Sequence, residues 1–173
     1  MKVFIALGAN QPAKFEGRVL TPEQTFARVI EGLSVRSVRT CAKSSIWQSP
    51  AWPDPMAQPA YENAVISVDT RLKPLELLNL LKEMERDFGR REGVRNAPRP
   101  LDLDIIDYHG IVTTTENLTL PHPRMLTRSF VLLPLSEIAP NWRDPQKNRT
   151  IHEWIARLVL KDVEPLKRLG RII

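Results

Sequence analysis

Residues 90–108, RREGVRNAPRPLDLDIIDY, join an arginine-rich segment to a run in which apolar and acidic residues alternate. Successive side chains of a β-strand point to opposite faces, so the alternation predicts a strand over 101–108. One face would carry apolar residues and the other would carry acidic ones: Leu101, Leu103 and Ile105 against Asp102, Asp104 and Ile106. We expect this strand at the centre of the fold.

Asp102 and Asp104 are the candidate metal ligands. On one strand face their backbones would lie about 7 Å apart, and two like charges this close need solvent, arginines or a metal ion nearby. Arginine side chains match phosphate oxygens, and paired carboxylates hold Mg²⁺. A solvated face is the alternative, but the flanking arginines favour a Mg²⁺-dependent enzyme that acts on a nucleoside triphosphate.

The remaining patterns predict an α+β fold. Strand patterns occur at 2–7, 35–47, 61–68 and 101–108, and helix patterns at 21–33, 74–88, 129–138 and 152–158. The first six elements follow the order βαββαβ, which is the split βαβ arrangement of a ferredoxin-like sandwich. The last two helices are C-terminal additions, and we expect one domain over 1–173.

Several residues have specific expectations. Cys41 is interpreted as a core thiol, because it lacks a nearby histidine. Leu75 is placed on the apolar stripe of the helix over 74–88, where Glu85 is either an edge residue or an inward carboxylate. Asn63 is either a satisfied core amide or a ligand-reading one. The basic tail over 167–173 is expected to lie along an edge or to be mobile.

Composition narrows the function classes. The net charge of +5 and the pI of about 9.7 suit nucleic acid, an anionic membrane or phosphate-rich ligands. One cysteine excludes an internal disulfide and fits a reducing cytosol. No run approaches the ~18 apolar residues of a membrane span, and the N-terminus lacks a signal-peptide cleavage site. These features predict a cytoplasmic protein.

The segment 49–59, SPAWPDPMAQP, is a long proline-rich loop with Trp52 near its centre. Loops of this length in compact domains are often lids or binding loops. Farther along the chain, Pro121 and Pro123 hold His122 in an extended conformation that excludes a helix. Both features indicate parts of a binding site.

Together these motifs resemble one family, 6-hydroxymethyl-7,8-dihydropterin pyrophosphokinase of folate biosynthesis. The matching pieces keep the family's order over roughly four fifths of the chain. They are LGAN at 7–10, SPAW…YEN at 49–63, E-x-x-x-G-R at 85–90 (ERDFGR), APRPLDLDI at 97–105 and LPHPRM…RSFVLLPLSEIAP at 120–140.

The resemblance implies transfer of pyrophosphate from ATP to 6-hydroxymethyl-7,8-dihydropterin, which gives the pterin diphosphate and AMP. Asp102 and Asp104 would hold two Mg²⁺ ions and, with Arg90 and Arg99, form the catalytic set. The residues implied for ATP binding are Glu85, Arg90, Arg95, Arg99, Ile105, Leu118, Thr119 and His122. Those implied for pterin binding are Gly8, Ser49, Pro50, Tyr61, Asn63 and Phe130.

The family's loop tryptophan is replaced here by Asn96, so we expect Trp52 to cover the pterin instead. The loops 49–60 and 89–98 are expected to close over the substrates and exclude water. The partners implied are ATP and the pterin, with no nucleic acid and no membrane, and the expected state is a monomer.

Two other functions use comparable features. A palm-type nucleotidyltransferase also binds Mg²⁺ through strand carboxylates, and it would need a third carboxylate, for which Glu62 and Asp69 are poor candidates. An RNA-recognition module fits the same fold and the high pI. It would need exposed aromatic side chains on its central strands, where the first strand offers only Phe4.

Overall fold

A computed structural model describes residues 2–51, 54–90, 98–159, 163 and 165–172. Trp52, Arg95 and most of the loop 89–98 therefore lie outside the described residues, as do the expectations placed on them. Among the helices within the described ranges, none is both long and apolar enough to cross a membrane.

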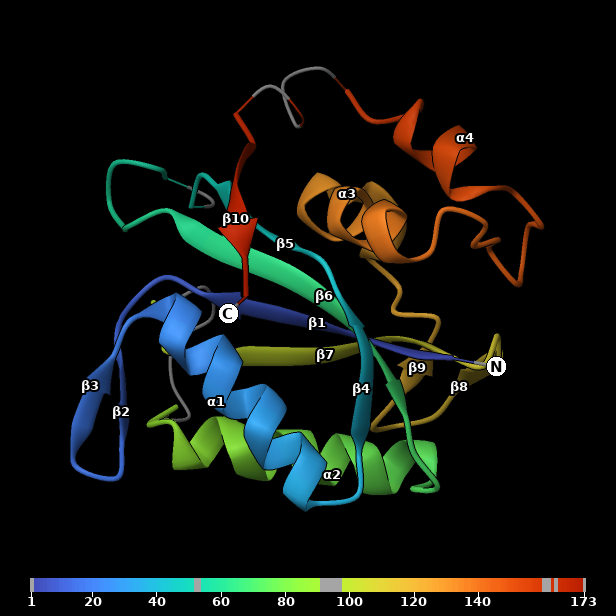
Figure 1. The fold of residues 1–173 in the computed structure, drawn as a ribbon. Coiled ribbons are helices and arrows are strands. Elements are labelled where there is room, and N and C mark those ends of the chain that lie inside the picture. The colour runs from blue at the N-terminus through green and yellow to red at the C-terminus, as the bar shows by residue number, and fades with distance from the viewer. Residues whose placement is uncertain (1, 52–53, 91–97, 160–162, 164, 173) are drawn as a thin grey trace.

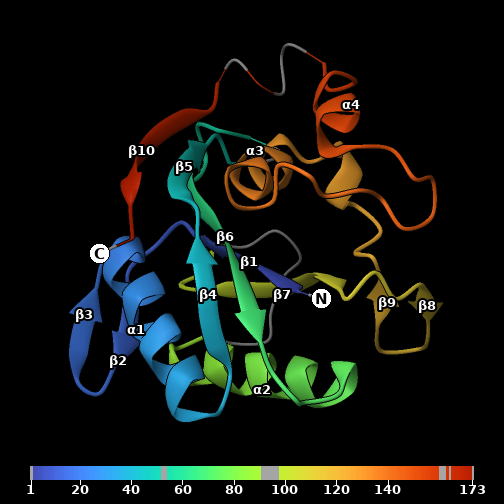
Figure 2. The same cartoon turned by 45° about the vertical axis from the view of Figure 1, so that its right-hand side comes forward.

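An antiparallel sheet forms the middle layer (Figures 1 and 2). Its order is β10-β5-β6-β1-β7, and β4 also pairs with β6. The strands are β1 (Val3–Ala9), β4 (Arg39–Lys43), β5 (Ser45–Ser49), β6 (Tyr61–Asp69), β7 (Asp102–Tyr108) and β10 (Lys167–Arg171). Two hairpins lie outside it: β2 (Ala13–Phe15) with β3 (Arg18–Leu20), and β8 (Thr113–Thr114) with β9 (Thr119–Leu120).

Helices α1 (Pro22–Val35) and α2 (Pro74–Asp87) cover one face of the sheet (Figure 1). A capping box starts α1, because the Thr21 hydroxyl accepts the Gln24 N–H while the Gln24 side chain accepts the Thr21 N–H. Gly89 closes α2 with a φ of 88°, a left-handed conformation that glycine adopts without strain. This glycine turns the chain from α2 towards Arg90.

The opposite face is covered by α3 (Ser129–Ile138) and α4 (Ile151–Ile155), with a 3₁₀ turn, η1 (Met125–Thr127), before them. A second apolar core lies between this layer and the sheet. Its buried members are Phe4, Val65, Ile106, Met125, Val131, Leu132, Leu135, Trp142 and Ile151. The predicted ferredoxin-like βαββαβ sandwich with added C-terminal helices is confirmed.

The two faces of β7 separate as predicted. Leu103 and Ile105 are buried in the core beneath α1 and α2, while Asp102 and Asp104 lie on the other face and are only partly covered. However, β7 is at the edge of the sheet and not at its centre. An edge strand can still carry apolar residues here, because helices cover both faces of the sheet and bury Leu103 and Ile105 on one face and Ile106 on the other.

Three local predictions were wrong. Val35 ends α1 and is exposed, and the strand expected from that point begins only at Arg39 and is interrupted at Ser44. Leu75 is exposed on α2. Cys41 is an exposed thiol, because the pairing with β6 shifts register between Thr40 and Ala42 and leaves Cys41 as the extra residue of a bulge.

The basic tail forms the edge strand β10, which pairs with β5. Its Ile172 is buried, and the Ile172 carbonyl accepts a hydrogen bond of 2.9 Å from Lys43. The tail is therefore edge-lying, the first of the two predicted alternatives.

We expect Leu103→Ala to lower the free energy of unfolding by about 2–5 kcal/mol, because it opens a cavity where a fully buried side chain packs beneath the acidic face of β7. Leu169→Ala is the matched control, since Leu169 is 52% exposed on β10 and should change the value by no more than about 0.5 kcal/mol. Urea unfolding measures both. Equal losses would contradict the packing described here.

Candidate active site

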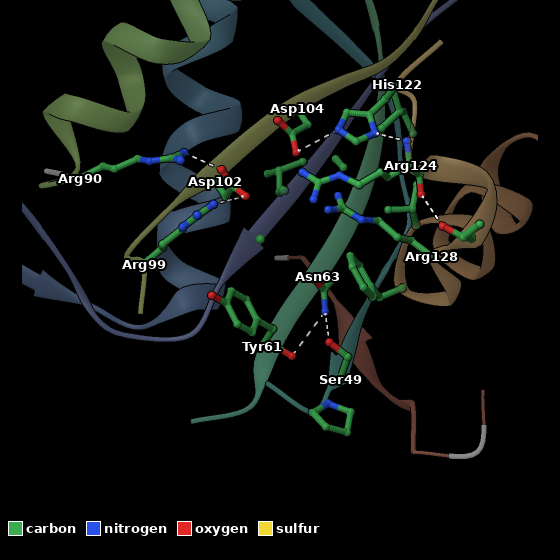
Figure 3. Close-up of a pocket in the computed structure, with 18 of the residues that line it drawn as sticks. Ser49, Tyr61, Asn63, Arg90, Arg99, Asp102, Asp104, His122, Arg124 and Arg128 are labelled. Carbon is green, nitrogen blue, oxygen red and sulfur yellow. Dashed lines mark hydrogen bonds and ion pairs between the residues drawn. The ribbon is translucent and has the colours of Figure 1, made fainter. Parts of the chain in front are cut away.

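A cavity of about 640 Å³ opens on the α3 side of the sheet (Figure 3). Strands β1, β5, β6 and β7 form its floor, and residues of η1, of α3 and of the segments before them form its wall. It brings together these predicted residues: Gly8, Ser49, Pro50, Tyr61, Asn63, Arg90, Arg99, Asp102, Asp104, His122 and Phe130. Residues that lie far apart in the sequence therefore share one cavity.

The cavity also contains residues that were not predicted. Lys82, Arg124, Thr127 and Arg128 line it, together with the apolar Ala6, Leu7, Ile106 and Val131. For the two arginines a signal existed, because they lie inside the PHPRM…RSF motif at 121–130. Glu85, Ile105, Leu118 and Thr119 are not among the described lining residues.

Asp102 and Asp104 project from β7 into this cavity, with side chains 26% and 32% exposed. Their neighbours on β1 are small, since Gly8 pairs with Asp102 and Ala6 pairs with Asp104. Small side chains beside the carboxylates leave room above the sheet for a ligand.

Two arginines neutralise Asp102 (Figure 3). Arg90 Nη1 lies 2.5 Å from Asp102 Oδ1, and Arg99 Nη1 lies 3.1 Å from Oδ2. Burial would raise the pKa of Asp102, but the positive charges of Arg90 and Arg99 outweigh it and hold the pKa below its ordinary value. Asp102 is therefore an ionised carboxylate.

A buried carboxylate at Glu85 positions Arg90. Glu85 is 2% exposed, and its Oε1 lies 2.6 Å from Arg90 Nη1 and 2.8 Å from Lys82 Nζ. The same oxygen accepts the Leu103 N–H at 2.7 Å, which joins α2 to β7. Burial raises the pKa of Glu85, against the opposing effect of Lys82 and Arg90. Of the two predicted alternatives, the inward carboxylate is correct.

Asn10, from the LGAN motif, fixes the backbone around Arg99. The Asn10 Oδ1 accepts the Arg99 backbone N–H at 2.7 Å, and the Asn10 backbone N–H donates to the Arg99 carbonyl at 3.0 Å. The Asn10 amide also donates to the Pro59 carbonyl at 3.2 Å. One buried side chain thus connects the end of β1 to both loops that border the cavity.

His122 is positioned through a bulge in β7. The pairing between β1 and β7 skips Ile106, and the Ile106 carbonyl accepts the His122 N–H at 2.9 Å. Nε2 of His122 then lies 3.9 Å from Asp104 Oδ2, while Nδ1 accepts the Arg124 N–H at 3.1 Å. Burial lowers the pKa of His122, and Arg128 and Arg124 add to that effect against Asp104.

The other end of the cavity is less charged. The Asn63 amide nitrogen donates to Ser49 Oγ at 2.9 Å (Figure 3). It also donates to the Trp47 carbonyl at 3.2 Å. Phe130 on α3 contributes an aromatic ring to the same cavity, and the Arg128 guanidinium lies 5.5 Å from the centre of that ring. A flat, polar-edged ligand fits between a ring and an amide of this kind.

Within the described residues, no group of three His, Cys, Asp or Glu side chains converges on a metal position. Two carboxylates alone still suit Mg²⁺, which is commonly bound by one or two carboxylates together with substrate phosphates and water. Neither Glu62 nor Asp69 is among the described lining residues, so neither adds the third carboxylate of a nucleotidyltransferase. Phe4 is buried and cannot stack on an RNA base.

The fold and the cavity define a class of protein: a ferredoxin-like α+β domain with paired aspartates, a cluster of arginines and a histidine beside a flat-ligand pocket. Residues 4–140 match the family model described as 7,8-dihydro-6-hydroxymethylpterin-pyrophosphokinase (HPPK). The chain belongs to that family.

Named relatives agree with this assignment. The chain is 34% identical over 168 residues to 2-amino-4-hydroxy-6-hydroxymethyldihydropteridine pyrophosphokinase of Pseudomonas aeruginosa, covering 95% of this chain and 96% of that one. A protein of the same name from Methylorubrum extorquens is 35% identical over 164 residues, covering 94% and 97%. Folic acid synthesis protein FOL1 of Dictyostelium discoideum is 38% identical over 158 residues, covering 91% of this chain and 22% of the relative's length.

We expect Glu85→Ala to lower the free energy of unfolding by about 3 kcal/mol or more, because it leaves two partly covered cations and the buried Leu103 N–H without their acceptor. Glu31→Ala is the control, since Glu31 forms an exposed pair with Arg28 that is worth about 0–1 kcal/mol. Urea unfolding at neutral pH compares the variants. A loss at Glu85 no larger than that at Glu31 would contradict the proposed anchoring of Arg90.

Proposed function

We propose that this protein transfers pyrophosphate from ATP to the hydroxymethyl oxygen of 6-hydroxymethyl-7,8-dihydropterin, with release of AMP. The observation that carries the proposal is a single cavity with an arginine and aspartate end and an amide and aromatic end, in a chain of this family. The two ends have the chemistry that a triphosphate and a pterin require.

At the phosphate end, Arg90, Arg99, Arg124 and Arg128 supply guanidinium groups for the phosphate oxygens. Asp102 and Asp104 would hold two Mg²⁺ ions, which neutralise phosphate charge when bound. Arg90 and Arg99 already contact Asp102, so they lie within reach of any phosphate that enters beside that carboxylate.

The remaining nucleotide contacts are part of the same proposal. The His122 imidazole would donate to a phosphate or ribose oxygen. Ile105, Leu118 and Thr119 would meet the adenosine mainly through their backbones, since Ile105 faces the core. Glu85 would act by holding Arg90 and Lys82, and Arg95 would reach the phosphates from outside the described residues.

At the pterin end, we propose that Asn63 reads the pterin edge and that Phe130 stacks on its ring. Gly8, Ser49, Pro50 and Tyr61 would complete the pocket, with Trp52 as a cover from the loop. A ring held between an amide and an aromatic side chain presents its hydroxymethyl group towards the phosphate end of the same cavity.

The chemistry needs no covalent nucleophile. Phosphoryl-type transfer depends on holding the attacking oxygen in line and on neutralising the charge that develops on the phosphate oxygens. The cavity lining supplies cations for the second requirement, and the proposed pterin pocket would meet the first. The cytoplasmic location, the single domain and the monomeric state stay predictions.

The direct test incubates the purified protein with ATP, Mg²⁺ and 6-hydroxymethyl-7,8-dihydropterin and follows the products by chromatography. We expect AMP and the pterin diphosphate in equal amounts. ADP as the nucleotide product, or no pterin product from a folded sample, would overturn the proposal.

We expect Asp104→Asn to reduce turnover by about 1,000-fold or more, because several kcal/mol of charge stabilisation at the phosphates would be lost. Asp69→Asn is the control, since Asp69 lies at the far end of β6 in an exposed pair with Arg39. Steady-state rates and circular dichroism are measured together. A folded Asp104→Asn protein with near-normal turnover would remove this carboxylate from the mechanism.

We expect Asn63→Ala to raise the KM for the pterin by about tenfold or more, the value of one or two lost hydrogen bonds, while the KM for ATP stays within about twofold. Asn79→Ala, on the exposed side of α2, is the control. Steady-state kinetics with each substrate varied in turn measure the two constants. An equal rise in both KM values would place Asn63 outside the pterin pocket.

A further inference from the structure

We infer that Glu137 is a positioning residue for the pterin end of the cavity, although it does not line that cavity. This inference rests on the proposed function, because it concerns the substrate that Asn63 and Phe130 would bind. Glu137 lies near the end of α3, where that helix passes β5 and the edge strand β10 (Figure 2).

The Glu137 carboxylate accepts two hydrogen bonds from β5 and forms an ion pair with Arg168 of β10. Its Oε2 accepts the Ser45 N–H at 2.7 Å, at the start of β5. Its Oε1 accepts the Trp47 indole N–H at 3.0 Å and lies 3.1 Å from Arg168 Nε of β10. The Ser45 contact is partly buried and the Trp47 contact lies at the surface, and a carboxylate acceptor makes each of them stronger than a neutral acceptor would.

Trp47 contacts both Glu137 and Asn63, which is a residue of the proposed pterin pocket. The Trp47 carbonyl accepts a hydrogen bond from the Asn63 amide nitrogen, and Ser49, two residues farther along β5, accepts another. Trp47 is also the register partner of Asn63 between β5 and β6. By accepting the Trp47 indole N–H, Glu137 on α3 therefore fixes the segment of β5 to which the Asn63 amide is hydrogen-bonded.

The same helix carries the opposite wall. Phe130 precedes Glu137 by seven residues, which is two turns, so both side chains leave α3 on the same side. Phe130 lines the cavity, and Glu137 holds β5 farther along the helix. The separation of the ring and the amide thus depends on how tightly α3 is held against β5, and Glu137 provides the polar part of that attachment.

A glutamine tests this role with little change of shape. Glutamine presents one acceptor oxygen and one NH₂ group, so it cannot accept from both Ser45 and Trp47 as the carboxylate does. Arg168 is a smaller part of the effect, because it is 59% exposed and surface ion pairs contribute little. The variant should loosen the attachment of α3 to β5 and leave Asp102 and Asp104 unaffected.

We expect Glu137→Gln to raise the KM for the pterin by about tenfold, the value of one lost charged hydrogen bond, with the KM for ATP within about twofold. Trp47→Phe, which removes the indole N–H together with part of the ring system and leaves a phenyl ring, should change the pterin KM in the same direction. The double variant should raise it by less than the product of the two single effects, because both act through one contact.

Glu153→Gln is the matched control. Glu153 also accepts a backbone N–H, that of Thr150, and caps α4 away from the cavity. It should lower the melting temperature without changing the pterin KM. A general loss of stability would reduce the active fraction and kcat, and would leave both KM values alone.

The outcomes separate the two proposals. A wild-type protein that forms no pterin diphosphate overturns the proposed function and this inference with it. An active wild type whose pterin KM is unchanged in Glu137→Gln and in Trp47→Phe overturns the inference alone. If Glu137→Gln fails to fold, Trp47→Phe still decides, since it keeps the carboxylate and its contact with Ser45.

Discussion

The two-residue alternation of β7 is the constraint on which the rest of this structure depends. Leu103 and Ile105 enter the core beneath α1 and α2, and that burial fixes Asp102 and Asp104 on the opposite face. A slip by one residue would move the carboxylates into the core and the leucine into the cavity. Hydrophobic burial on one side of the strand therefore determines where charge is presented on the other.

Two carboxylates on one strand face repel each other, and neighbouring residues compensate this repulsion. Arg90 and Arg99 neutralise Asp102, and Glu85 in turn holds Arg90 from inside α2. Asp104 has the His122 imidazole nearby, positioned by the bulge at Ile106. Both carboxylates of the cavity thus have a cationic or imidazole neighbour supplied by the segments around β7.

Sequence reasoning predicted the features that depend on local pattern, such as the alternation of β7 and the helix over 21–33, and the family resemblance indicated the main cavity residues. It missed what depends on tertiary contacts. The exposure of Cys41 follows from a register shift that no spacing reveals. The inward turn of Glu85 depends on the Leu103 N–H, and the place of Lys82 in the cavity depends on how α2 packs against β7. The edge position of β7 is likewise a matter of strand pairing.

The basic strand β10 has a consequence for the behaviour of the protein in concentrated solution. An exposed sheet edge offers unpaired backbone groups to other molecules, and natural proteins discourage such pairing with lysine and arginine. Here Lys167, Arg168 and Arg171 lie along that edge, and a net charge of +5 adds a repulsion between whole molecules. Both effects oppose aggregation, and both weaken as salt screens the charges.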